Sequence, residues 1–179
     1  MKVTAGKFRT YTGKEFDLIN PIKEDIDIID IARSLAFQCH FGGHVTDFFS
    51  IAQHCIYVLE AYESECNKYD RKPDLLLMKA CLLHDSTEAY IGDMIKPLKV
   101  LLPDYKMIED KLQHAIFEKF DIPIKYLSMV KPYDLSIQFL EYNTFQSNDL
   151  YNKCTEFWKP QDAEIEFLDC FNRLFLTNH

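Results

Sequence analysis

The sequence predicts one all-α domain, a helical bundle that carries a short β-hairpin at its N-terminus. Its 179 residues are enough to bury a single core. Hydrophobic residues make up 47% of the chain and only 5 residues are glycine, which is typical of a compact helical protein. Apolar residues recur at helical spacing, and no repeat, low-complexity tract or linker divides the chain, so residues 1–179 are expected to form one domain.

The N-terminal part is expected to hold the hairpin and a first helix. Residues 8–16 alternate between apolar and polar around a Thr-Gly turn signal, which favours a short hairpin. Apolar residues within 26–39 follow helical spacing, with Asp25 or Asp27 placed to start the helix. The helix should end near the paired glycines after Phe41, because glycine is a poor helix former.

Two longer helices are expected next. The Thr-Asp pair before residue 48 can cap a helix over 48–62, which has a continuous apolar face. The charged segment 63–71 should be a surface loop. Asp74 then begins a central helix that should run to Gly92, and the first half of that helix, LLLMKACLL, is almost entirely apolar.

Prolines are expected to divide the C-terminal half. Residues 105–120 have the apolar stripe of an amphipathic helix. A short piece over 123–130 should end before Pro132, which restarts the chain as a further helix. Pro160 should lie in the first turn of the last helix, where a missing N–H costs nothing.

Charge and cysteine usage limit the class of protein. The formal net charge is -8 and no run of Lys and Arg occurs, so a nucleic-acid polymer is not an expected partner. The 6 cysteines form no CxxC pair and are expected to be reduced. No signal core and no run of about 18 apolar residues is found, so the expected location is cytoplasmic, without a membrane partner.

Ionisable side chains crowd the second half of the central helix, directly after its apolar run. Buried charges are costly unless they are paired or bound to a metal. On a helix, His84 and Glu88 lie about 40° apart and Asp85 lies about 100° from His84, so the three share one edge. An imidazole and a carboxylate suit a divalent transition metal, and His54 and Asp134 on flanking helices are the best further donors. The crowded set is His84, Asp85, Glu88, Asp93, Lys96 and Lys99.

Each of these residues also has a structural interpretation. An inward histidine such as His54 is usually a hydrogen-bonded core residue, and an isolated His-Asp pair often arises by chance. Asp134 follows a proline near an expected helix start, where it could serve as an N-cap. Two lysines in a loop are more often solvated than functional. It is the conjunction of these residues that favours a metal site.

The ordered set His54, His84-Asp85 and Asp134 resembles the H…HD…D signature of the HD-domain phosphohydrolase superfamily. The segment AQHCIYV is similar to that family's first-histidine helix. The segment HDSTEAYIGDMIKPLK resembles the HDxxE…GDxxxPxK stretch of its bacterial 5'-deoxynucleotidases and of related phage enzymes that hydrolyse deoxynucleoside triphosphates.

Two further features are similar to the phage-type members. One is a CxFGGH-like entry before the first ligand helix, and the other is an aspartate-led helix that runs here from Asp134 to Glu141. The resemblance covers about residues 8–145. It is fairly specific, because motifs, order and spacing agree together.

Carried over residue by residue, the resemblance implies an all-helical domain in which the four signature residues hold a divalent cation: Mn, Co, Zn, Mg or Fe. It implies that Glu88 and Asp93 form an acid/base pair that activates water and handles protons near the phosphate. Lys96 and Lys99 are then expected to contact phosphate, and Pro97 resembles a family position close to the substrate base. Homo-oligomers, dimers or larger, are also implied.

One position departs from the family pattern. Family members usually carry an arginine just before the FGGH-like turn, where it grips phosphate, and this chain has His40 there. Arg33, about two turns earlier on the expected helix, is the candidate substitute. An imidazole is a shorter and pH-dependent phosphate ligand, so the departure bears on substrate affinity and on the preferred number of phosphates.

The expected function is therefore metal-dependent hydrolysis of the 5'-phosphate ester of a (deoxy)nucleotide. A dNMP and a dNTP both remain open as substrates, because either places its scissile phosphate at the same metal. The alternative is a non-catalytic HD module that binds a nucleotide; it predicts loss of a ligand or of the Glu88/Asp93 pair, and all are present. A di-iron oxygenase of the same fold would need extra histidines, and His114 falls on the wrong face of its helix.

Overall fold

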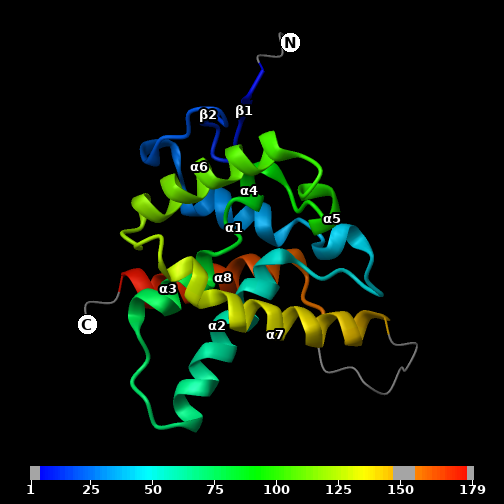
Figure 1. The fold of residues 1–179 in the computed structure, drawn as a ribbon, viewed down its shortest axis with the longest axis vertical. Helices are drawn as coiled ribbons and strands as arrows, with labels where there is room; N and C mark the ends of the chain where they lie inside the picture. Colours follow the sequence, from blue (N-terminus) through cyan, green and yellow to red (C-terminus); the bar gives the residue numbers. More distant parts are fainter. Residues whose placement is uncertain (1–4, 147–155, 177–179) are drawn as a thin grey trace.

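The computed structural model describes residues 5–146 and 156–176, except for the side chains of residues 145 and 146. Helices dominate this part of the chain, and one antiparallel sheet of two strands precedes them. The predicted all-α architecture with an N-terminal hairpin is therefore confirmed. Figure 1 shows the strands beside one end of the helical body.

Strands β1 (Lys7–Arg9) and β2 (Glu15–Asp17) form the hairpin. Gly13 in its turn has a φ of +90°, a left-handed conformation that glycine adopts without strain. Phe16 is fully buried and stacks on Tyr90 with ring centroids 4.3 Å apart. The predicted hairpin is therefore present, and it covers part of the helical core.

Helix α1 (Ile28–Ala36) begins at the predicted aspartate. The Asp27 side chain caps it by accepting a hydrogen bond from a first-turn N–H at 3.0 Å. The helix ends before the expected glycine pair, which belongs to a separate 3₁₀ turn, η2 (His40–Gly43). Phe41 and Gly42 in η2 have φ values of 56° and 61°. This left-handed backbone turns the chain sharply before the next helix.

Helix α2 (Ile51–Lys68) starts and ends later than predicted. Ser50 caps it by accepting from a first-turn N–H at 3.1 Å, in place of the expected Thr-Asp pair. The helix also continues into segment 63–71, so the prediction of a loop there is wrong. Tyr62 and Cys66 are buried and extend the apolar face of the helix by more than a turn, which explains the additional length.

The predicted central helix is divided into two, α3 (Leu75–Leu83) and α4 (Glu88–Ile91). Residues 84–87 between them make i→i−3 hydrogen bonds, such as the 3.0 Å bond from the Glu88 N–H, and these bonds are typical of a 3₁₀ turn. The prediction of one uninterrupted helix is therefore wrong. Because the tighter turn changes the rotation per residue, the expected shared edge of His84 and Glu88 does not exist.

Four further helices complete the described chain: α5 (Lys96–Lys99), α6 (Pro103–Lys119), α7 (Tyr126–Gln146) and α8 (Pro160–Phe175). Pro160 opens α8 from its first turn, as predicted. Helix α7 runs through Pro132, so the predicted break there is wrong. A proline removes one helical hydrogen bond, but Val130 and Asp134 on either side of it are buried and keep the segment packed.

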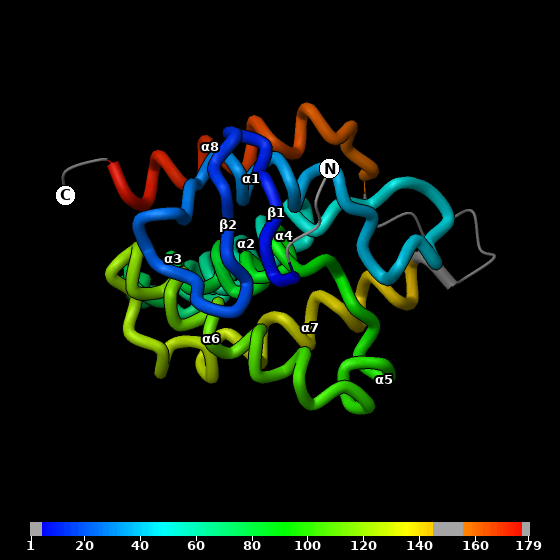
Figure 2. The backbone as a smooth tube through the Cα atoms, turned by 90° about the horizontal axis from the view of Figure 1, so that it is seen from above, coloured from blue at the N-terminus to red at the C-terminus, as the bar shows by residue number. Residues whose placement is uncertain are grey.

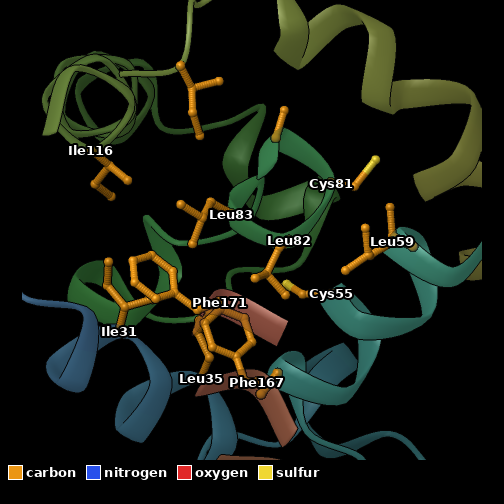
Figure 3. Packing of buried hydrophobic residues seen from close by; sticks show 14 of the residues in the cluster. Ile31, Leu35, Cys55, Leu59, Cys81, Leu82, Leu83, Ile116, Phe167 and Phe171 are labelled. Carbon is orange, nitrogen blue, oxygen red and sulfur yellow. The ribbon is translucent and has the colours of Figure 1, made fainter. Parts of the chain in front are cut away.

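The core lies where α1, α2, α3, α7 and α8 pack against one another. Leu82 and Leu83 of α3 are fully buried, and Leu59 of α2 and Phe167 of α8 lie close to them (Figure 3). Burying one such side chain stabilises the fold by roughly 1.5–3 kcal/mol. Figure 2 shows the hairpin crossing α1 and α4 on one face of this body. The core therefore fixes the ends of α3 and its neighbours, where the candidate ligands lie.

Two sequence expectations bear on the chemistry of the whole chain. Burial raises the pKa of the Cys81 thiol to about 12, so this cysteine stays protonated. No described helix combines the length and the apolar character that a membrane span requires. Cys154 lies outside the described residues, and the described cysteines are all free: Cys39, Cys55, Cys66, Cys81 and Cys170.

Candidate metal centre

Three packed helices bring the four predicted ligands to one place. His54 lies in the first turn of α2, His84 and Asp85 directly follow α3, and Asp134 lies in the third turn of α7. These helices pack against one another in pairs. Both histidines and Asp134 are buried. Because Asp134 lies inside a helix and not at its start, it does not act as an N-cap.

The ligand atoms face one another across a space of the size that a metal ion needs. His84 Nε2 lies 3.2 Å from Asp85 Oδ2 and 3.8 Å from Asp134 Oδ1. His54 Nε2 lies 3.7 Å and 3.4 Å from the same two oxygens. Ligand atoms about 2.1 Å from one tetrahedral cation would be about 3.4 Å apart. The four nitrogen–oxygen separations agree with this value. His54, His84 and Asp134 form a group that could hold a metal ion, and Asp85 belongs to an adjoining group that shares His84.

Hydrogen bonds on the outer side of each imidazole leave the inner nitrogen bare. His54 Nδ1 donates to both carboxylate oxygens of Glu141, each at 3.0 Å. His84 Nδ1 donates to the backbone carbonyl of Cys81 at 2.8 Å. In both rings Nε2 is buried without a hydrogen-bond partner among the described residues. An imidazole protonated on Nδ1 presents the Nε2 lone pair, which is the form that binds a metal.

The charges in this cluster depend strongly on one another. Burial would raise the pKa of Asp134, but His54 and His84 hold it well below its usual range. His84 likewise keeps the pKa of Asp85 low in spite of burial. Burial lowers the pKa of His54, but Glu141 and Asp134 outweigh this effect and raise it well above its usual range. A cluster that attracts protons this strongly also attracts other cations.

A flanking group of three side chains, His40, Glu88 and Asp93, adjoins the ligands. Potential ligand atoms of the three lie within 4.8 Å of one another. The His40 ring lies 4.7 Å from that of His54, and its Nδ1 is 3.1 Å from an Asp93 carboxylate oxygen. Asp93 follows Gly92, whose φ of +81° turns the chain back toward η2. Burial raises the pKa of Asp93, but His40 and a backbone N–H of η2 bring it below its usual value.

Glu88 is the most deeply buried carboxyl of the flanking group. Lys99 Nζ lies 3.2 Å from Glu88 Oε1 and 2.8 Å from Glu109 Oε1, so one ammonium group joins α4, α5 and α6. Burial raises the pKa of Glu88 well above its usual value, and the negative charges of Asp85 and Asp93 add to this effect. Glu88 therefore favours its protonated form, whereas Asp93 favours its ionised form.

Three of the residues that were predicted to bind substrate do not contact the four candidate metal ligands in the described part of the chain. Lys96 and Pro97 are exposed on α5. The Arg33 guanidinium pairs with Glu164 of α8 at 3.0 Å and lines a separate cavity beside the hairpin. His40 and Lys99 are therefore the predicted contacts that the structure brings to the candidate site.

A cavity of about 230 Å³ opens directly onto the ligands. Side chains of α6 and α7 form most of its wall, and His84, Asp85 and Asp134 lie on its boundary. Among the described residues, the members of the flanking group do not line it. The ligands thus have the cavity on one side. They also adjoin the flanking group, which is not part of the cavity wall.

The sequence is similar to known proteins over part of its length. It is 41% identical over 129 residues to the uncharacterized protein YfdR of Escherichia coli, which corresponds to 71% of this chain and 65% of YfdR. It is 35% identical over 118 residues to the uncharacterized protein RCAP_rcc00048 of Rhodobacter capsulatus, which corresponds to 64% of this chain and 58% of that protein. The chain therefore spans less than two thirds of the length of each relative. No protein-family profile matches the sequence.

Three polar residues of α7 support the ligands, and none of them was predicted as a site residue, although the resemblance includes Glu141 as the end of its aspartate-led helix. Glu141 orients His54, while Lys131 Nζ and Gln138 Nε2 donate to the two carboxylate oxygens of Asp134 at 2.5 Å and 2.6 Å. Lys131 precedes Asp134 by about one helical turn, and Gln138 and Glu141 follow it by about one and two turns. Helical spacing around a candidate ligand is the signal that could have identified them.

Proposed function

We propose that this chain is a metal-dependent phosphohydrolase of the HD-domain superfamily that hydrolyses the 5'-phosphate ester of a (deoxy)nucleotide, either a dNMP or a dNTP. The supporting observation is the convergence of two bare imidazole nitrogens and two carboxylate oxygens, with nitrogen–oxygen separations from 3.2 to 3.8 Å. The four residues occur in the order of the superfamily signature. A buried core alone gives no reason to leave two imidazole nitrogens without partners.

The donor set favours a divalent transition metal. Two neutral nitrogens and two carboxylate oxygens suit Mn²⁺, Co²⁺, Zn²⁺ or Fe²⁺, and suit Mg²⁺ less because that ion prefers oxygen ligands. When bound, such a cation would polarise a phosphoryl oxygen and lower the pKa of water at the site. Glu141 and the Cys81 carbonyl would keep both imidazoles in the ligating form.

The two carboxyl groups of the flanking group would have opposite roles. In the proposed step, a water oxygen bonds to phosphorus while the bond from phosphorus to the 5'-oxygen breaks. Asp93, whose pKa is lowered, accepts the proton of the water. Glu88, whose pKa is raised by burial, donates its proton to the departing 5'-oxygen. Two carboxyls with pKa values moved in opposite directions are the arrangement that such acid/base catalysis uses.

Positive charge near the phosphate would come from a small number of residues. Lys99 is half-buried and already contacts the proposed acid, and Lys96 lies on the same short helix. His40 would contact phosphate through its Nε2, which is buried and has no hydrogen-bond partner among the described residues. Arg33 has a carboxylate partner on α8, so His40 is the better candidate for the role of the family's arginine.

A substrate and metal screen tests the proposal. Nucleoside mono-, di- and triphosphates are each incubated with Mn²⁺, Co²⁺, Zn²⁺, Fe²⁺ or Mg²⁺, and orthophosphate, pyrophosphate and triphosphate are measured separately. We expect orthophosphate from a dNMP or triphosphate from a dNTP, with transition metals more effective than Mg²⁺. No product from any combination would contradict the proposal and would favour the non-catalytic binding module.

The variant Asp85→Ala tests the assignment of the site within the same screen. It removes one of the four proposed ligands, so bound metal and hydrolysis should both be lost. Asp169→Ala, at an exposed position of α8, is the matched control and should retain both. Full activity of Asp85→Ala would show that the chemistry takes place elsewhere.

A further inference from the structure

We propose that the nucleoside part of the substrate occupies the cavity between α6 and α7, and that Gln113 recognises the edge of its base. The inference rests on the proposed function, because it assigns the part of the nucleotide that the metal ligands do not hold. Three observations carry it: the polarity of the cavity walls, one buried amide without a partner, and the size of the cavity.

The cavity has an apolar end and a polar end. Along α7 its wall changes from the apolar Leu127 and Val130 to the ligand Asp134. Along α6 it carries Lys106 near the start of the helix, paired with two carboxylates of the same wall, and Gln113 about two turns later. Figures 1 and 2 show α6 and α7 running in opposite directions, so the second half of α6 lies on the side of the first half of α7, which contributes the apolar part of the wall.

Gln113 lines the cavity and has a buried amide nitrogen without a partner among the described residues. Its side chain is only 5% exposed. A buried donor without an acceptor is costly, so native proteins seldom retain one without a role. An acceptor atom on the edge of a bound base would satisfy it, while Leu127 and Val130 contact the flat face of the base.

The size of the cavity suits the nucleoside part of the substrate. About 230 Å³ is below the ~300 Å³ at which pockets begin to enclose whole small ligands, so the cavity suits part of a nucleotide whose phosphate stays at the metal ligands. Among the described residues neither Asp93 nor Glu88 lines the cavity, so a nucleoside can occupy it without displacing either carboxyl group. Glu88 is linked to the cavity wall through Lys99, which is hydrogen-bonded to Glu109.

The chemistry of the free donor predicts which bases are preferred. The N–H needs an acceptor, and we expect it to face the ring position where guanine and thymine carry a carbonyl oxygen (O6 and O4) and adenine and cytosine carry an amino group. A site built to hydrogen-bond one group discriminates against analogues that leave its polar atom unpaired. We therefore expect kcat/KM for guanine and thymine nucleotides to exceed that for adenine and cytosine nucleotides by about tenfold.

Two substitutions of one residue test the inference. Gln113→Glu replaces the donor by an acceptor of the same shape and should shift the preference toward adenine and cytosine. Gln113→Leu removes hydrogen bonding and should make the four bases nearly equal. Gln161→Leu, at an exposed position of α8, is the matched control and should retain the wild-type ranking. The readouts are kcat/KM for the four deoxynucleotides and direct calorimetric binding of the four phosphate-free deoxynucleosides to the full chain.

The two readouts separate this inference from the proposed function. Hydrolysis with an unchanged base ranking in both Gln113 variants would overturn the inference and leave the function standing. Deoxynucleoside binding that depends on Gln113, without hydrolysis of any nucleotide, would support the base site and overturn the function. If both variants fail to fold, the wild-type ranking decides: a preference for adenine or cytosine overturns the inference, and a preference for guanine and thymine supports it.

Discussion

A buried histidine can bind a metal only if one ring nitrogen carries a lone pair that points at the ion. Glu141 meets this condition for His54, because its carboxylate accepts the Nδ1 proton at 3.0 Å and leaves Nε2 bare. The sequence predicted His54 as a ligand, but 87 positions separate it from Glu141. Such a pairing depends on how α2 and α7 pack and not on any local pattern.

We predict that Glu141→Gln weakens metal binding by about 10–100-fold, the usual effect of changing a residue that orients a ligand. The amide oxygen still accepts from His54 Nδ1, but it lacks the charge that favours this tautomer. The dissociation constant, measured by competition with a chelating dye, tests the prediction. Glu166→Gln, exposed on α8, removes the same charge and is the control. Equal affinities of the two variants would contradict the assigned role of Glu141.

We predict that metal affinity falls as the pH is lowered. Burial lowers the pKa of both histidines. The neighbouring carboxylates, among them Glu141 beside His54 and Asp85 beside His84, outweigh burial and raise both pKa values well above the usual value. A metal binds the neutral imidazole, so it must displace protons. Affinity should be greatest above the raised pKa values and should decrease as the pH falls through them. Calorimetry in buffers of different ionisation enthalpy would detect the released protons, and a pH-independent affinity would contradict the prediction.

The interruption between α3 and α4 is the structural element on which the candidate site depends. If α3 continued as an ideal helix, His84 and Glu88 would lie on one edge of it. The 3₁₀ turn over residues 84–87 instead leaves His84 among the ligands and Glu88 in the flanking group. The helices themselves were largely predictable from apolar spacing. The interruption was not, because nothing in the apolar run before His84 indicates where a helix tightens.

We predict that Lys99→Ala and Lys96→Ala have different effects. Lys99 favours the ionised form of Glu88, so its removal should raise the pKa of that carboxyl further and move the basic limit of the kcat–pH profile to higher pH. Lys96→Ala should leave the profile in place and raise KM if that side chain contacts phosphate. Identical pH profiles for both variants would exclude a link from Lys99 to the proposed acid.

At the scale of the whole molecule, an exposed apolar region lies where α5 leads into α6. Val100 and Leu101 are 77% and 73% exposed, and Ile95, Leu98 and Leu102 near them are also exposed. Single exposed leucines are common, but a run of this kind is typical of a surface that another chain covers. It favours the homo-oligomer, dimeric or larger, that the family resemblance implies.

We predict that the wild-type chain is larger than a monomer by light scattering and that Leu101→Glu reduces its mass, because a buried unpaired charge at an interface is costly. Ile165→Glu on α8 introduces the same charge at another exposed apolar position and serves as the control. A monomeric wild-type chain, or equal masses for all three proteins, would contradict the proposed interface.

The helical class, the hairpin, most of the helices and the identities of the four candidate ligands follow from the amino-acid sequence. Apolar spacing is local information, and residue types such as His84 and Asp85 are read directly. The assembly of the site depends on the packing of the folded chain: the continuous α7 through Pro132, the cavity beside α6, and the pairing of His54 with Glu141. Contacts between distant helices arise from packing of the whole core, so a local pattern cannot specify them.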